Sequence, residues 1–197
     1  MQAQTLVFFG IVGSGKGTQV KLATEFLKSK GVREVVCVGT GDIFRKIVDS
    51  SANDDYTKMI KDLLLAGKLV PDEETNKLVL DIVESQMSPD KDFIFDGYPR
   101  TVIQSGVFEN MMEKSGRKDI KIIYIELSKE EAMKRNLLRG RSDDTEAGLN
   151  MRFDEYVNNV VPAMNYFKDK TSYGIYKING EQSIEDVHKD IINALGF

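Results

Sequence analysis

The chain has 197 residues, a formal net charge of −4 and an apolar fraction of 41%. This length suffices for one domain with a sizeable core, and the acidic balance argues against a nucleic-acid groove. The single cysteine cannot form an internal disulfide, and no stretch has the length of a membrane span or the pattern of a signal peptide. We therefore expect a one-domain cytoplasmic protein that binds neither nucleic acid nor membrane.

The first predicted element is a buried strand in the apolar run TLVFFG, residues 5–10. The glycine-rich turn GSGKGT follows at residues 13–18, and the amphipathic pattern from Thr18 onward predicts a helix. Strand, turn and helix in this order are the context of a phosphate-binding loop, in which backbone N–H groups, a helix N-terminus and a lysine face the anion. At Gly17 the turn departs from the usual pattern, which has Ser or Thr there. We predict that this loop binds a nucleotide polyphosphate.

Further apolar runs alternate with helical patterns along the rest of the chain. Four more strands are predicted, at residues 35–38, 93–96, 120–127 and 173–180. Helices are predicted at residues 42–48, 56–66, 72–86, 102–114, 129–138, 146–168 (with a kink at Pro162) and 183–195. This alternation predicts an α/β fold with a five-stranded parallel sheet flanked by helices. We expect Cys37 to be buried in the second strand and His188 to lie on the surface.

Five motifs carry glycines, arginines and carboxylates suited to binding phosphate, and six of the eight arginines fall in them. They are GSGKGTQ (13–19), GTGDIFR (39–45), GKLVPD (67–72), DGYPR (96–100) followed by Gln104, and the set Arg135, Arg139, Arg141 and Arg152. In this order they resemble the motifs of the adenylate kinases, within the nucleoside monophosphate kinase family, over essentially the whole chain. The resemblance implies a P-loop NTPase-type three-layer fold with strand order 2-3-1-4-5. It also implies an acceptor-binding subdomain at about 39–69 and a very short lid at about 139–152 within the single domain 1–197.

The resemblance implies an enzyme that reversibly transfers a phosphoryl group from Mg-ATP to AMP, giving two ADP. Two alternatives are a UMP/CMP kinase and a non-catalytic nucleotide-binding P-loop module. Gln104 and Thr40 favour AMP, because the pyrimidine-monophosphate relatives tend to carry Asn and a smaller residue at these places. The implied partners are ATP, AMP and ADP. We expect a monomer, with a homo-oligomer as the alternative.

The same resemblance assigns site residues in three overlapping groups. The catalytic group consists of Lys16, Arg100, Arg135, Arg141 and Arg152. The ATP-binding group consists of Gly13, Ser14, Gly15, Lys16, Gly17, Thr18, Arg135 and Arg139. The AMP-binding group consists of Thr40, Arg45, Leu69, Val70, Gly97, Arg100, Gln104, Arg141 and Arg152. Guanidinium groups bind phosphate oxygens in pairs and cancel the repulsion between two polyphosphates.

Asp96 ends the third predicted strand, at the edge where open α/β sheets hold ligands, and is the expected magnesium carboxylate. Because Gly17 offers no hydroxyl, we expect the contact to run through metal-bound water. No zinc is expected. A general base is unnecessary, since the second phosphate pKa of a monophosphate is about 6.

Two departures from the family pattern have consequences of their own. Val12 stands where the family's G-x-P-G segment has proline, which removes a rigid residue but no donor. Only Gly140 separates Arg139 from Arg141, so the long inserted lid is absent. We therefore predict a permissive donor-base site and slow hydrolysis of ATP without acceptor.

Overall fold

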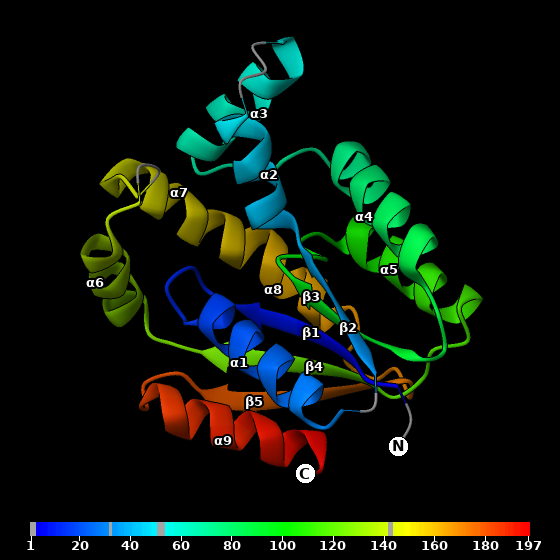
Figure 1. Ribbon diagram of the computed structural model, residues 1–197. Helices are drawn as coiled ribbons and strands as arrows, with labels where there is room; N and C mark the ends of the chain where they lie inside the picture. Colours follow the sequence, from blue (N-terminus) through cyan, green and yellow to red (C-terminus); the bar gives the residue numbers. More distant parts are fainter. Residues whose placement is uncertain (1–2, 32, 51–53, 142–143) are drawn as a thin grey trace.

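The computed structural model describes residues 3–31, 33–50, 54–141 and 144–197, and a parallel sheet runs through its middle (Figure 1). The strands are β1 (Thr5–Gly10), β2 (Glu34–Gly39), β3 (Lys91–Asp96), β4 (Ile120–Glu126) and β5 (Tyr173–Asn179). Their order is β2-β3-β1-β4-β5, and every neighbouring pair is parallel. The predicted three-layer α/β fold and its strand order are confirmed.

Helices cover both faces of the sheet (Figure 1). One face carries α1 (Lys16–Ser29) and α9 (Ile184–Leu195); the other carries α4 (Asp72–Gln86), α5 (Val102–Lys114) and α8 (Val161–Asn165). The remaining helical elements are α2 (Thr40–Asp49), α3 (Asp55–Leu65), α6 (Lys129–Arg139), α7 (Glu146–Glu155) and the π-helix η1 (Tyr156–Val160). Among the described residues, no helix is both long and apolar enough to cross a membrane.

The alternation of side chains along β1 builds two separate cores. Leu6 and Phe8 pack with Ala23 of α1 and Ile191 of α9 on one face. On the other face, the β1 residues Val7 and Phe9 join a cluster formed with α4, α5 and α8. Because both faces are covered, all six β1 residues are buried, which explains the uninterrupted apolar run in the sequence. Burial of each large side chain stabilises the fold by about 1.5–3 kcal/mol.

The strand register brings the functional loops together at one edge of the sheet. Asp96, the last residue of β3, pairs with Gly39 at the end of β2 and with Phe8 in β1. Gly10, at the end of β1, pairs with Ile125 of β4. After β3 the chain crosses to the other side of β1 and forms β4 there. The loop after β1 therefore lies at the point where the strand order reverses. This is where open α/β sheets bind ligands.

Several local details differ from the sequence-based expectations. Cys37 is exposed, because β2 is an edge strand; the Oγ1 of Thr24 on α1 lies 3.1 Å from the Cys37 Sγ. The predicted helix 146–168 is instead α7, η1 and α8, with the π-turn directly before the segment that contains Pro162. The first helix begins at Lys16 rather than Thr18.

Candidate active site

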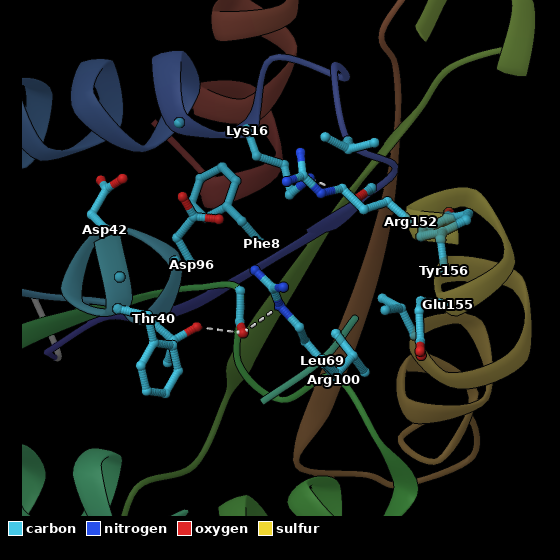
Figure 2. A pocket seen from close by; sticks show the side chains of 18 of the residues that line it. Phe8, Lys16, Thr40, Asp42, Leu69, Asp96, Arg100, Arg152, Glu155 and Tyr156 are labelled. Atoms are coloured by element: carbon cyan, nitrogen blue, oxygen red, sulfur yellow. Dashed lines mark hydrogen bonds between the residues drawn. The ribbon is translucent and has the colours of Figure 1, made fainter. Parts of the chain in front are cut away.

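A cleft with a volume of about 770 Å³ opens at the carboxyl edge of the sheet (Figure 2). The loop after β1, the start of α2, the end of β3, α6 and α7 all contribute to its lining. Of the site residues predicted from the sequence, only Ser14 does not line it. Ser14 is buried just beneath, with its Oγ 3.5 Å from the Lys16 Nζ. The fold thus brings together residues that lie as far apart in the chain as Gly13 and Arg152.

The phosphate loop presents backbone donors to this cleft. Gly13 and Gly15 both have φ of +88°, a conformation that a residue with a Cβ rarely adopts. Helix α1 starts at Lys16 with no side-chain cap and no acidic residue in its first turn. Its N-terminal N–H groups and the positive end of its dipole therefore remain available to an anion.

Lys16 is folded back onto its own loop. Its Nζ donates to the carbonyl oxygens of Gly10 at 2.6 Å and Ile11 at 2.9 Å. Burial lowers the pKa of Lys16 to about 8; Asp96 opposes this shift, whereas Arg100 and Arg139 add to it. In Figure 2 Lys16 and Asp96 both extend into the cleft. The negative charge of a phosphate group bound here would stabilise the protonated form of Lys16 and raise its pKa again.

Arg100 and Arg45 approach each other on the side of the cleft near the end of β3 and the start of α2. The Arg100 Nε donates to the carbonyl of Gly97 at 2.8 Å, and the Thr40 Oγ1 donates to the same oxygen at 2.7 Å (Figure 2). A Cβ on Gly41 would lie 3.1 Å from an Arg45 nitrogen and 3.7 Å from an Arg100 nitrogen, so both guanidinium groups border the same small space. Burial lowers the pKa of Arg100, and Arg45 and Arg152 reinforce the shift while Asp96 opposes it. Such a cluster of cations suits a dianionic phosphate.

Gln104 is buried at the wall of this part of the cleft. Its Oε1 accepts from the backbone N–H of Arg100 at 2.8 Å, and its Nε2 donates to Asp72 at 2.8 Å. An amide group has two donor hydrogens and two acceptor lone pairs, so one of each remains for a ligand. Leu69 and Val70 line the cleft alongside and supply an apolar surface.

Helix α6 supplies the arginines of the opposite side. Arg135 and Arg139 stand four residues apart, and the helix ends at Arg139 with Gly140 as its C-cap at φ of +63°. The Arg135 Nε donates to Glu131 at 2.8 Å, and one terminal nitrogen donates to the Gly180 carbonyl at 3.0 Å. These contacts hold the Arg135 guanidinium at the rim of the cleft.

Asp144 connects Arg139 with Arg152, a role that the sequence did not reveal. Arg139 binds both carboxylate oxygens, at 2.8 and 2.9 Å, and Arg152 binds one of them at 3.0 Å. Burial opposes ionisation of this carboxyl, yet the hydrogen bonds and charges of the two arginines hold the pKa of Asp144 below its ordinary value. Arg152 also donates to the Leu64 carbonyl at 3.2 Å, which connects this cluster to the end of α3. The neighbouring Asp143 lies outside the described residues.

The cleft is also lined by residues that the sequence did not single out, among them Asn136, Glu155 and Tyr156. Tyr156 and Glu155 project from the end of α7 and the π-helix near Arg152 (Figure 2). Tyr156 donates from its hydroxyl to that of Tyr124 at 3.1 Å. Their position depends on the π-turn, for which the sequence carries no clear signal other than Pro162 nearby.

The donor set suits a magnesium nucleotide rather than a metal held by protein alone. Among the described residues there is no group of three or more His, Cys, Asp or Glu side chains that could hold an ion. Asp96 offers a single carboxylate beside Lys16. Magnesium characteristically binds one or two carboxylates together with waters and substrate phosphates, so Asp96 fits this type of contact.

A phosphate loop that faces arginines from several other parts of the fold defines a P-loop phosphotransferase. The adenylate kinase family profile matches residues 8–172. The chain is 35% identical to an adenylate kinase of Prochlorococcus marinus (strain MIT 9211) over 98% of this chain and 97% of the relative. It is 31% identical to adenylate kinase 1 of Nostoc sp. (strain PCC 7120) over 97% and 98%. With an adenylate kinase of Corynebacterium urealyticum it shares 32% identity over 96% and 98%. The chain belongs to the adenylate kinase family.

Proposed function

We infer that the chain catalyses reversible transfer of the terminal phosphoryl group of ATP to AMP, giving two ADP. Membership of the adenylate kinase family supports this activity. The observation that carries it in the structure is the convergence on one cleft of Lys16, Asp96 and arginines from α2, α6, α7 and the segment after β3. Neither a UMP/CMP kinase nor a non-catalytic module is favoured by any feature of the cleft.

We assign the phosphate loop and α6 to the donor nucleotide. Backbone N–H groups of the loop and the N-terminus of α1 would bind the donor phosphates, and Lys16 would leave its two carbonyl partners to bind the outer phosphates. Arg135 and Arg139 would neutralise the donor side. Replacing weak carbonyl contacts by phosphate contacts favours the protonated lysine, which is the form that stabilises transferring charge.

The other side of the cleft we assign to AMP. Arg45 and Arg100 would bind its phosphate, and Gln104, Leu69 and Val70 would contact the adenine. Arg141 and Arg152 would stabilise the group in transfer from between the two nucleotides. Catalysis of this kind depends on positioning and charge stabilisation, because the AMP oxygen is already largely deprotonated at neutral pH.

Magnesium, bound with ATP, would neutralise phosphate charge, and Asp96 would hold it through metal-bound water. Cofactor dependence of this kind is checked by removing Mg²⁺ with a chelator. We expect turnover to fall to background and to return when Mg²⁺ is restored in excess.

An acceptor panel tests the proposed function. Purified protein receives Mg-ATP with AMP, UMP, CMP or GMP, and each nucleotide diphosphate is separated and measured. We expect AMP to be the preferred acceptor. Faster turnover with UMP or CMP would instead assign a pyrimidine-monophosphate kinase, and nucleotide binding without turnover of any acceptor would leave a binding module.

A further inference from the structure

Asn136 is a fully buried polar residue between α6 and the phosphate loop, with 0% of its surface exposed. Its Nδ2 donates to the Val12 carbonyl at 3.0 Å and to the Ala132 carbonyl at 2.7 Å. The same amide nitrogen lies 2.5 Å from the point that a Cβ on Gly13 would occupy. Helix α6 therefore packs directly on the loop at this residue.

The orientation of this amide is determined by its neighbours. Rotating it by half a turn would place Oδ1 against the carbonyl oxygens of Val12 and Ala132, which repel it. In the observed orientation Oδ1 is buried, with no hydrogen-bond partner in the part of the chain that the structure describes. A buried acceptor without a partner costs stability, and an apolar side chain of similar size would avoid that cost. Packing alone therefore does not account for an asparagine here.

The bond to Val12 fixes a peptide group of the loop. The Val12 carbonyl and the Gly13 N–H belong to one planar trans peptide, so a carbonyl held toward Asn136 directs that N–H away from α6. Val12 also occupies the position at which the G-x-P-G segment of the adenylate kinase family has proline. The ring of a proline would restrict the backbone there. Asn136 supplies a restraint from outside the loop at the place where the chain lacks one within it.

We propose that Asn136 is a positioning residue of the donor site. It orients the Val12–Gly13 peptide and sets the spacing between the phosphate loop and the helix that carries Arg135 and Arg139. The inference rests on the proposed assignment of the loop to the donor phosphates. It concerns a residue that contacts the loop and not the reacting atoms.

Asn136→Leu tests the role, because leucine keeps the approximate size and removes both the bond and the orphaned acceptor. We expect KM for ATP to rise about three- to tenfold, the effect of one neutral hydrogen bond. KM for AMP should stay within twofold, and the thermal midpoint should not fall. Asn193→Leu, on the exposed face of α9, is the matched control and should change neither KM.

Rescue by proline distinguishes positioning from packing. We expect Val12→Pro to improve kcat/KM for ATP more in the Asn136→Leu background than in the parent, because it restores the restraint inside the loop. Equal effects in both backgrounds, or an unchanged KM for ATP in Asn136→Leu, would overturn the proposal. Should the leucine variant fail to fold, Asn136→Ala takes its place, and it should likewise raise KM for ATP while leaving KM for AMP within twofold. Loss of folding in both variants would assign a structural role and also overturn it.

Lys16→Met separates this inference from the donor-site assignment on which it rests. If Lys16→Met loses activity while Asn136→Leu leaves KM for ATP unchanged, the donor assignment stands and only the role of Asn136 fails. If Lys16→Met keeps parental kinetics with ATP, the donor assignment itself is wrong.

Discussion

Asp144→Asn would test whether one buried carboxylate organises the arginines of the cleft. Asparagine preserves the shape of the side chain but removes its charge and one of its acceptor oxygens. Arg139 would lose its paired contact at 2.8 and 2.9 Å, because only one oxygen remains to accept. The contact of Arg152 at 3.0 Å would become a bond to a neutral amide oxygen and lose its charge assistance. The two arginines would then repel each other without a counter-charge between them.

The size of the effect follows from the exposure of the partners. Breaking a buried ion pair typically costs about 3–5 kcal/mol. The Asp144 side chain is 0% exposed, but that of Arg139 is 31% exposed and can turn toward water. We therefore expect a loss of about 2–3 kcal/mol in the free energy of unfolding, below the range for a fully buried pair. Misplacing the arginines by about 1 Å should reduce kcat by roughly a hundredfold.

Urea unfolding and steady-state kinetics with ATP and AMP measure the two effects on the same preparation. Asp154→Asn, an exposed site on α7, makes the same charge change on a nearby helix and should behave as the parent. A value of kcat within twofold of the parent, together with an unchanged unfolding midpoint, would refute the organising role of Asp144.

Three further predictions concern other parts of the cleft. Because burial holds the pKa of Lys16 at about 8 and phosphate favours its charged form, the affinity for ATP should be constant below pH 8 and decline above it by up to about tenfold per pH unit. Titration calorimetry across this pH range measures the decline of ATP affinity, which should be absent in Lys16→Met, a variant that should also lose most of its turnover. An ATP affinity of the parent that does not change with pH would contradict the prediction. Gln104→Ala should narrow the preference for AMP over CMP by about 1–3 kcal/mol, measured as a ratio of kcat/KM values, and an unchanged ratio would remove Gln104 from base recognition. Because only Gly140 separates Arg139 from Arg141 in the proposed lid region at about 139–152, GTP and CTP should serve as donors at rates near that of ATP, and ATP should be hydrolysed slowly when AMP is omitted. Strict use of ATP without detectable hydrolysis would contradict this prediction.

The sheet and the phosphate loop could be predicted from the sequence because their signals are local. The uninterrupted apolar run of β1 follows from burial on both faces, and the glycines of the loop follow from a backbone that a Cβ would obstruct. Likewise, the helical pattern was sufficient to predict a helix at 129–138, close to the observed bounds of α6 (Lys129–Arg139).

Other features depend on tertiary contacts that leave little local trace. Asp144 stood in the sequence as one carboxylate among several, and its role appears only where α6 and α7 bring two arginines to it. Asn136 gave no signal, because an asparagine in a helix is usually exposed. The burial of Cys37 was predicted wrongly, since apolar neighbours in the sequence do not reveal that β2 is the edge strand and only partly covered.

Incubation of the purified protein with Mg-ADP alone tests the central claim most directly. Transfer between two nucleotides predicts that ADP is converted into ATP and AMP in equal amounts, without release of inorganic phosphate beyond slow background hydrolysis. ³¹P NMR follows all of these species in one sample, and Lys16→Met serves as the inactive control. Stable ADP, or its loss to AMP and inorganic phosphate without ATP, would contradict an adenylate kinase reaction in this cleft.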